Sequence, residues 1–520
     1  MRCLLVTTVL FVLSALAAAA EPPAEHITVD VDALKFSGER RHLFRSSVFY
    51  NAATDTSRRL YVEAFPDHHA ARIWGLFETE SWRSRDLDSF RKLLNARREE
   101  IEALSRRHRK LIVMIAMMPP WLSVSDDDRL ILGRWRRLHA HGPTDYRKWE
   151  QIVTAAAEFF RQFDVERYYE IWNEPDLEYW QEGVDAFLRL YAHTARSIRA
   201  IDREGRIGGA AANGWQGKVR ASPERDPVNL ELIRFARRRD LPLDFVSWHH
   251  YGTGQEPVIA EARAGYERAC RDAGYARMPE WIVSEWHLMP ADRDAPMAAA
   301  MLADAMLGLY EAGVDVQTIC AWADFHPSPH REGYGLVTFE GQRKPAFHLH
   351  RFFDEIGRQP DGIAIVRHGP DDPLARRTRL IVARAGDRRL SILVWTSGFD
   401  AATGAAIRHL KQRGVVERFG SMVELIEAVR TGRPRSRRYR KLFDDAAAIY
   451  REKSADLIPR RRATIDLGNA VKVTKGTAKA IANAVVEKPI DVNAAQVSFD
   501  LGMYEVVKIE LEIERVASNE

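Results

Sequence analysis

The sequence is poor in cysteine and in long apolar runs, and its charges nearly cancel. Three cysteines occur in 520 residues, and one of them, Cys3, lies in the N-terminal apolar segment, so one disulfide is arithmetically possible in the rest of the chain but no feature of the sequence supports it. Cys270 and Cys320 are expected to be buried free thiols. After residue 20, no apolar run is long enough to span a bilayer. A net charge of +4, with both signs interspersed, points to no particular partner.

The first 20 residues differ from the rest of the chain. Arg2 precedes a mostly apolar stretch, Leu4–Leu16, which is followed by the small residues Ala18 and Ala20. This pattern predicts a signal peptide over residues 1–20 that is cleaved after Ala20, and hence a secreted or periplasmic protein. An uncleaved membrane anchor is the alternative, but the apolar stretch is short for a span that needs about 20 residues.

From about residue 48 to residue 351, short apolar runs alternate with longer helical patterns. The candidate strands are Arg45–Tyr50, Ala71–Leu76, Leu111–Met117, Tyr168–Trp172, Arg206–Ala211, Leu243–Trp248, Glu280–Ser284 and Val316–Trp322. Such alternation is typical of βα units and a parallel sheet. Eight units favour an α/β fold of the (β/α)8 TIM-barrel type over residues 40–355. An open doubly wound sheet is less favoured, because no Gly-rich dinucleotide-binding turn follows the first strand.

Residues 21–39 and 356–520 have a different pattern of apolar and polar residues. Alternating strand patterns occur in His26–Phe36, Thr378–Ala383, Arg389–Trp395, Ala495–Leu501 and Tyr504–Ile513. We expect these segments to form an accessory β-sandwich domain. An Arg-rich helical pattern at about 420–455 interrupts the strands, and the sequence assigns this insertion no role.

Two of the predicted barrel strands end in a glutamate. In Tyr169–Pro175, apolar and aromatic residues are followed by Asn173 and Glu174, and the proline prevents the strand from continuing. In Trp281–His287, an apolar strand carries Glu285 to the same rim. The carboxyl ends of the strands form the catalytic face of this fold. A partly desolvated carboxyl beside an aromatic ring keeps its proton and suits a general acid, and a second carboxylate suits a nucleophile.

These motifs resemble glycoside hydrolase family 39, a family of clan A retaining glycosidases that includes β-xylosidases, α-L-iduronidases and exopolysaccharide hydrolases. Further segments that are similar to the family are Met118–Trp121, Ser247–Tyr251, Gly335–Val337 and Lys344–His348. The match covers roughly residues 45–355. The first strand and the region after residue 351 depart from the family pattern, which leaves the substrate open.

The resemblance implies a role for each residue at the two strand ends. Glu174 would protonate the glycosidic oxygen as general acid/base, and Glu285 would attack the anomeric carbon as the nucleophile. Asn173 would hydrogen-bond the sugar 2-OH beside the nucleophile.

The resemblance also implies which residues surround the sugar. His249 and Tyr251 would line the site and tune the carboxylates, and Arg72 would hydrogen-bond the nucleophile. Trp286 would lie beside the substrate, and Trp322 would be a stacking platform for the apolar face of the sugar. A structural salt bridge for Arg72 and core packing for Trp322 remain alternatives.

Four histidines, His249, His250, His287 and His326, lie at predicted strand ends on the same rim. A metal centre is the alternative reading of this group. No His-Glu-x-x-His motif and no acidic cluster accompany these residues, which favours a polar sugar-binding wall. We therefore expect no metal and no cofactor.

Taken together, these features predict an exported retaining O-glycosyl hydrolase that acts on a poly- or oligosaccharide. A barrel that only binds carbohydrate and a transglycosylase in exopolysaccharide processing are the alternatives. Basic runs such as Arg237–Arg239 are interspersed with acidic residues and indicate solvated surface, not a nucleic-acid site. An acidic exopolysaccharide stays open as the substrate, and the oligomeric state stays open as well.

Overall fold

The computed structural model describes residues 25–51, 54–73, 83–131, 135–252, 256–295, 297–327, 333–370, 372, 374–416, 421–434, 436–454, 460–482 and 484–516. The predicted signal peptide lies outside these residues. The chain divides into two compact units. One contains Glu39–Arg358 and Gly420–Met422, and the other contains Met1–Gly38, Gln359–Phe419 and Val423–Glu520.

The first unit is a closed barrel of eight parallel strands, in the spatial order β10-β11-β2-β3-β4-β7-β8-β9. In chain order the strands are β2 (Ser47–Tyr50), β3 (His68–Ile73), β4 (His108–Ile115), β7 (Glu166–Ile171), β8 (Arg206–Ala212), β9 (Phe245–Gly252), β10 (Glu280–Leu288) and β11 (Val316–Ile319). The predicted barrel fold is thereby confirmed. In chain order β7 is the fourth barrel strand and β10 the seventh, as the sequence predicted.

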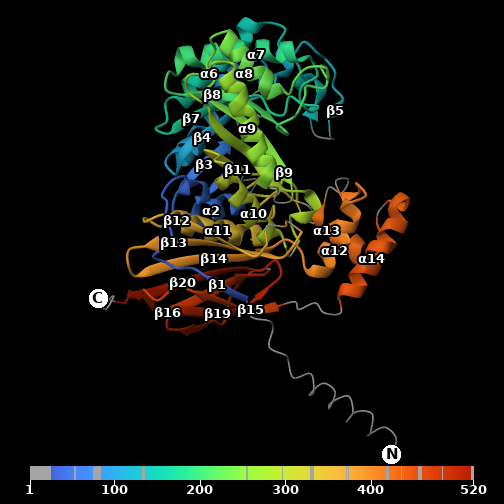
Figure 1. The fold of residues 1–520 in the computed structure, drawn as a ribbon. Coiled ribbons are helices and arrows are strands. Elements are labelled where there is room, and N and C mark those ends of the chain that lie inside the picture. The colour runs from blue at the N-terminus through green and yellow to red at the C-terminus, as the bar shows by residue number, and fades with distance from the viewer. Residues whose placement is uncertain are drawn as a thin grey trace, which may run out of the picture. The chain divides into compact units, whose positions relative to one another are not determined.

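Helices cover the outside of the barrel, and Figure 1 shows α6, α7 and α8 beside strands β4, β7 and β8. The helices are α2 (Asp55–Ala64), α4 (Leu87–Ala96), α5 (Arg98–Ser105), α6 (Tyr146–Phe160), α7 (Val184–Ile201), α8 (Val228–Arg238), α9 (Glu256–Asp272), α10 (Ala298–Glu311) and α11 (Pro345–Gly357). Capping boxes at Thr54 and Asp86 satisfy free backbone N–H groups where α2 and α4 begin. In the loop after β4, β5 (Leu130–Ile131) and β6 (Trp135–Arg136) form a small ribbon.

One apolar layer fills the interior of the barrel. It consists of Ala70, Ile112, Tyr168, Phe245, Ile282 and Val316, each from a different strand. Because strand side chains alternate between two faces, residues two further along also point inward. Arg72, Met114 and Glu170 therefore form part of the next layer, directly below the carboxyl ends of the strands.

The second unit contains two sheets around an apolar core. Its strands are β1 (Glu25–Thr28), β15 (Arg460–Asp466), β18 (Asp491–Asn493) and β19 (Gln496–Gly502) in one sheet, and β12 (Ile363–His368), β13 (Arg377–Ala385), β14 (Arg389–Ser397), β16 (Val471–Ile481), β17 (Val485–Glu487) and β20 (Val506–Arg515) in the other. β15 and β16 were not predicted from the sequence. In β16, Gly476, Ala478 and Ala480 weaken the strand pattern because glycine and alanine are depleted in strands.

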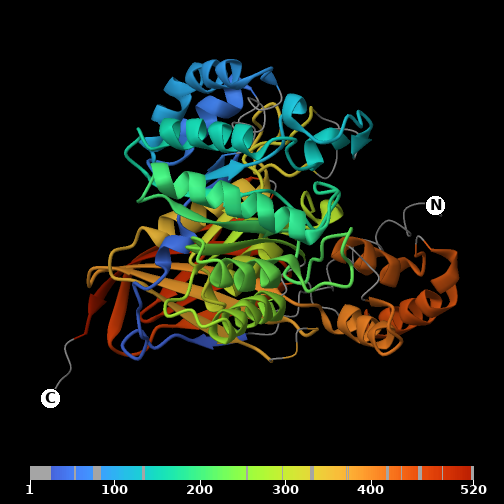
Figure 2. The same cartoon turned by 90° about the horizontal axis from the view of Figure 1, so that it is seen from above.

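Three helices lie together between β14 and β15 in the sequence, and both views show them side by side in orange (Figures 1 and 2). They are α12 (Ala401–Lys411), α13 (Met422–Thr431) and α14 (Arg440–Ser454). The predicted insertion at about 420–455 misses α12, whose Ala- and Gly-rich sequence has little amphipathic pattern. Among the described residues, no helix is both long and apolar enough to cross a membrane.

Candidate active site

Glu174 and Glu285 lie at the ends of β7 and β10 and are mostly buried, with 8% and 7% of their surface exposed. β7 ends at Ile171, and the backbone then turns through two residues in the left-handed region, Trp172 at φ 76° and Glu174 at φ 46°. Such values are uncommon for residues other than glycine and concentrate at functional sites. The Glu174 N–H donates to the carbonyl of Ala211 (2.9 Å), which fixes the turn.

His249, on β9, bridges the two carboxyl groups. Its Nδ1 is 2.8 Å from Glu174 Oε1 and 3.7 Å from Glu285 Oε2. One side-chain oxygen of each glutamate and one nitrogen of His249 all lie within 4.8 Å of one another. The two carboxyl groups therefore face the same small space.

Arg72, on β3, is fully buried and binds three groups of the site. Its Nε donates to Glu170 Oε2 (2.6 Å), its Nη1 to Glu285 Oε1 and its Nη2 to Asn173 Oδ1 (2.8 Å). The planar guanidinium has donors in a fixed fork, so it sets the relative positions of these three side chains.

The surroundings keep Glu285 ionised. Burial raises the pKa of Glu285, but the neighbouring His249 and Arg72 and the Tyr251 hydroxyl outweigh burial and hold the pKa below 4.5. Tyr251 Oη donates to Glu285 Oε2 at 2.6 Å. Burial lowers the pKa of His249, but Glu285 and Glu174 raise it above 6.5 overall. The two carboxyl groups therefore favour the charged form of His249, which in turn offsets part of their negative charge.

Two further carboxyl groups adjoin the site, and sequence analysis assigned a role to neither. Glu170 is fully buried, and its Oε1 has no hydrogen-bond partner in the described part of the chain. An inward-facing carboxyl was predictable here, because Glu170 interrupts an apolar strand and lies two residues from Tyr168 on the inward face. Asp176 accepts a hydrogen bond from the Asn213 N–H (2.9 Å), and burial with the charge of Glu174 raises the pKa of Asp176 to about 6.

The predicted tryptophans lie elsewhere. Trp322 is fully buried, its indole N–H donates to the carbonyl of Ser57 in α2 (2.8 Å), and its ring packs edge-on against Tyr61. The core-packing alternative describes this position better than a sugar platform. Trp286 follows the inward-facing Glu285 directly, and its indole N–H donates to Gln317 Oε1 (2.5 Å). The single N–H donor of each indole is therefore used away from the two glutamates.

Cys320 takes the place at the site that Trp322 was expected to hold. Its thiol is hydrogen-bonded with the Tyr251 hydroxyl, and burial followed by the charge of Glu285 raises the pKa of Cys320 well above its ordinary value. It packs with Phe49 and, beside them, Phe325 and Tyr334, which gives this side of the site an aromatic wall. Cys270 and Cys320 are both free and buried.

Glu174, His249 and Glu285 also satisfy the spacing of a metal site among the described residues. Two features favour an ionic cluster instead. Arg72 already donates to Glu285, and the His249 nitrogen closest to the carboxylates lies at hydrogen-bond distance from Glu174. The guanidinium of Arg72 opposes a second cation at this point.

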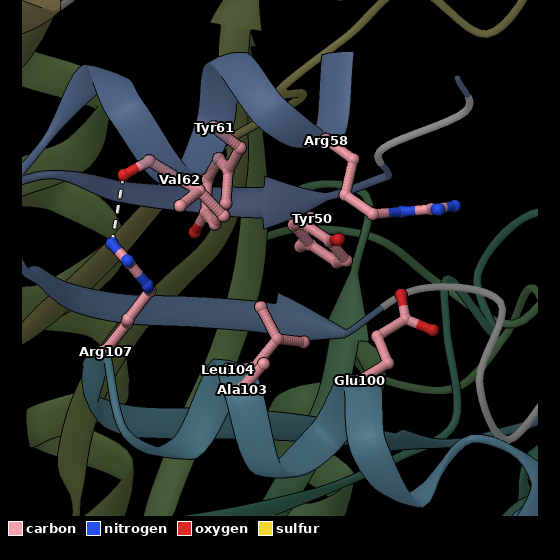
Figure 3. Close-up of a pocket in the computed structure, with 8 residues that line it drawn as sticks. All are labelled: Tyr50, Arg58, Tyr61, Val62, Glu100, Ala103, Leu104 and Arg107. Carbon is pink, nitrogen blue, oxygen red and sulfur yellow. Dashed lines mark hydrogen bonds between the residues drawn. The ribbon is translucent and has the colours of Figure 1, made fainter. Parts of the chain in front are cut away.

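A separate pocket of about 250 Å³ lies between α2 and α5. Figure 3 shows Tyr50, Tyr61 and Leu104 around it, with Arg107 donating to the carbonyl of Val62 (2.9 Å). Burial raises the pKa of Tyr50 above its ordinary value. Neither glutamate of the site lines this pocket, so we assign it no part in the chemistry.

Part of the barrel is similar to a known protein family. The family model described as Glycosyl hydrolases family 39 matches residues 116–269, a stretch that contains Glu174 and His249 and ends before Glu285. The predicted resemblance to glycoside hydrolase family 39 is confirmed. Of the residues that the sequence predicted around the sugar, the structure joins these six by hydrogen bonds: Glu174, Glu285, Asn173, His249, Tyr251 and Arg72.

Two curated relatives are β-xylosidases. The chain is 24% identical over 299 residues to one from Geobacillus stearothermophilus, which covers 50% of this chain and 54% of that protein. It is 24% identical over 241 residues to one from Caldicellulosiruptor saccharolyticus, covering 41% of this chain and 47% of that protein. The chain therefore spans about half the length of the curated relatives that it matches.

Solved structures share the fold over almost the whole chain. The GH39 enzyme from Xanthomonas axonopodis pv. citri superimposes with a TM-score of 0.63 at 17% identity, covering 95% of this chain and 99% of that one. A GH39 β-xylosidase from Caulobacter crescentus gives a TM-score of 0.56 at 15% identity, covering 94% and 100%. At these identities the similarity establishes the fold alone.

Proposed function

We propose that this protein is an exported retaining glycosidase that cleaves poly- or oligosaccharides, with Glu174 as the acid/base and Glu285 as the nucleophile. The observation that carries the proposal is the arrangement of two buried carboxyl groups joined by His249. Retaining glycosidases hold their carboxyl groups about 5–5.5 Å apart, whereas inverting enzymes keep a gap of about 6.5–9.5 Å for water. Side-chain oxygens within 4.8 Å support the retaining mechanism.

In the first step, Glu285 attacks the anomeric carbon and the bond to the leaving-group oxygen breaks. Glu174 gives its proton to that oxygen, so the aglycone leaves as an alcohol and the sugar stays bound as an ester of Glu285. Arg72 and Tyr251 hold one oxygen of Glu285 each, which fixes the direction of attack. Their donors also keep the carboxylate ionised before the reaction.

In the second step, Glu174 is a carboxylate and accepts a proton from water. The water oxygen bonds to the anomeric carbon, the ester bond breaks and Glu285 is released as a carboxylate. Before substrate binds, His249 contacts Glu174 through Nδ1 (2.8 Å). We propose that it stabilises the charge that alternates between the two glutamates, since its Nδ1 lies near both.

β-Xylosides are the substrates to test first, because the two curated relatives are β-xylosidases. Acidic exopolysaccharides belong in the same panel. Export rests on the N-terminal pattern of residues 1–20, and the expected product is a mature chain that begins at Glu21. Mass spectrometry of the protein from periplasm or culture medium checks this, and an intact N-terminus would contradict it.

The decisive experiment combines variants with product stereochemistry. On 4-nitrophenyl β-D-xylopyranoside, or the aryl glycoside that the panel selects, we expect Glu285→Gln to lower kcat by at least about a thousandfold. Proton NMR should show that the first sugar released keeps the anomeric configuration of the substrate. Glu178→Gln is the matched control, since Glu178 follows Glu174 closely but pairs with Arg220 (2.9 Å). Near-native turnover by Glu285→Gln, or an inverted first product, would overturn the mechanism.

A further inference from the structure

The ring of His287, two residues beyond Glu285 on β10, has a defined protonation state. The backbone N–H of Leu288 donates to His287 Nδ1 (2.7 Å), so this nitrogen carries no proton. Burial lowers the pKa of His287 well below 6.5, and the nearby charges of Arg293 and Lys344 lower it further. The neutral ring therefore carries its one proton on Nε2.

This Nε2–H group is buried and has no hydrogen-bond partner among the described residues. An unpartnered buried donor costs about 1–3 kcal/mol, and orphaned N–H groups are rarer in native structures than unpartnered acceptors. His68, His69, His249 and His250 also have a buried Nε2 without a partner among the described residues, but for none of them does a backbone N–H donor to Nδ1 place the ring proton on Nε2. In His68, for example, Nδ1 lies 2.8 Å from the Ser46 hydroxyl, which can accept as well as donate. The ring proton of His68 can therefore be on Nδ1, which leaves Nε2 without a proton and without this cost.

The strand register places His287 on the wall of the active site. Glu285 pairs with His249 across β9 and β10, and His287 pairs with Tyr251. Side chains opposite each other on neighbouring strands share a face, and His249 and Tyr251 both reach the carboxylates. The guanidinium of Arg293 lies 5.7 Å from the Tyr251 ring centre, which closes the rim beside this pair.

We propose that His287 is a substrate-binding residue whose Nε2–H donates to a hydroxyl or ring oxygen of the sugar held at Glu285. The proposal rests on the proposed glycosidase function. A neutral acceptor fits better than an anion, because the ammonium of Lys344 is already paired with Asp324 (2.8 Å) and Asp294 (3.0 Å). The missing partner of the donor is then the substrate.

A donor of this kind also discriminates between sugars. When a substrate lacks the matching oxygen, the N–H stays unpaired in a desolvated place, and the loss exceeds that of an exposed hydrogen bond. His287 thus selects for one oxygen of the sugar, whereas Glu174 and Glu285 act on any glycoside that reaches them.

The first test uses two variants that separate the two ring nitrogens. His287→Asn places an oxygen where Nδ1 accepts from Leu288 but has no group at the Nε2 position, whereas His287→Gln reaches that position with an N–H. With 4-nitrophenyl β-D-xylopyranoside, we expect the Asn variant to lower kcat/KM about five- to tenfold, mostly through KM. The Gln variant should stay within about threefold of native. His193→Asn, the same change on the outer helix α7 where His193 pairs with Glu150 (2.7 Å), is the matched control and should leave kcat/KM unchanged.

Monodeoxy derivatives of the same xyloside locate the acceptor. Removing the contacted hydroxyl should cost the native enzyme about tenfold in kcat/KM but cost the Asn variant less than about twofold, since the two losses are coupled. If no deoxy derivative distinguishes the native enzyme from the Asn variant, but the Asn variant still has a raised KM, the contact is assigned to the ring oxygen. Unchanged KM together with a lowered melting temperature would overturn the proposal, because that pattern belongs to a structural residue.

A second test does not depend on turnover. In protein labelled with ¹⁵N-histidine, comparison with His287→Asn identifies the His287 signals. At pH 7 they should show a protonated Nε2 and a bare Nδ1, and the Nε2 signal should move on addition of D-xylose or another sugar of the panel. A proton on Nδ1, or a signal that no sugar moves, would overturn the role of His287. If no glycoside is hydrolysed but the signal moves, the hydrolase proposal fails and the binding role of His287 stands.

Discussion

The rim of the barrel and the core of the second unit bury side chains of opposite character. The core between the two sheets is built from residues such as Val394, Phe499 and Ile509, all apolar. The rim buries Arg72, Glu170 and other ionisable groups in one connected network. Taking charges out of water costs several kcal/mol per ion, so such a network stabilises a fold poorly. The difference indicates that the rim is arranged for chemistry and the sheet core for stability.

The largest effect is expected from Arg72→Met. It leaves Glu170 and Glu285 buried without their shared cation, which should cost about 3–5 kcal/mol of unfolding free energy. Activity should fall by about a hundred- to a thousandfold, because the pKa of Glu285 rises and its position is lost. Denaturant unfolding and kcat/KM measure the two effects.

Arg72→Lys is the matched control for that variant. It keeps the positive charge but loses the planar fork, so we expect most of the stability to return while kcat/KM stays clearly below native. An Arg72→Met protein with native stability would show that the buried carboxyl groups do not depend on the guanidinium.

The second prediction concerns the sheet core. Phe499→Ala removes a fully buried ring and should lower the unfolding free energy by about 3–5 kcal/mol. Below the melting temperature, kcat and KM should stay native, since the core contributes no group to the proposed reaction. Calorimetry with parallel kinetics tests this. A fall in kcat at a temperature where the protein is fully folded would contradict the division of roles.

The barrel and its two glutamates were predictable from sequence for physical reasons. Strands buried on both faces are continuous apolar runs, such as Leu111–Met117, and a polar residue at the end of such a run stands out. Trp172 and Pro175 mark where β7 ends, and the same reasoning places Glu285. The fold class and the resemblance to family 39 followed from these signals.

The side chains whose direction depends on backbone detail were not predictable. A regular strand over Val316–Trp322 would point Cys320 and Trp322 to one face. β11 ends at Ile319 instead, so the alternation stops and only Cys320 reaches the site. Glu170 was overlooked because its partner, Arg72, is distant in sequence, and only the closed barrel brings the two together.

The third prediction concerns the hydrogen bond that keeps Glu285 ionised. Tyr251→Phe keeps the ring but removes the hydroxyl that donates to Glu285. A hydrogen bond to a charged group contributes about 1.5–3 kcal/mol, so kcat/KM should fall about ten- to a hundredfold. The pKa of Glu285, held below 4.5 in the native protein, should rise.

The direction of the pH effect follows from that rise. A depressed carboxyl pKa stabilises the fold above the ordinary value of 4.5, and this stabilisation is lost as the pH falls through the lowered value. In Tyr251→Phe, the acid limb of the kcat/KM profile should therefore move to higher pH and part of the acid-range stability should disappear. An acid limb that stays in place would show that Arg72 and His249 alone set the charge of Glu285.

The smallest effect is expected where a charged pair lies in water. Arg106, directly after α5, forms an ion pair with Glu102 of that helix (2.6 Å), with 73% and 47% of their side-chain surface exposed. Solvent screens such pairs, which typically contribute about 0.2–1 kcal/mol, so Arg106→Ala should change the unfolding free energy by less than that upper figure and leave kcat/KM unaltered. Added salt should reduce even this difference, whereas the effect of Arg72→Met should persist because its network is shielded from solvent. If Arg106→Ala and Arg72→Met lost equal unfolding free energy, burial would not explain why charged groups at the rim of the barrel differ from those on the surface.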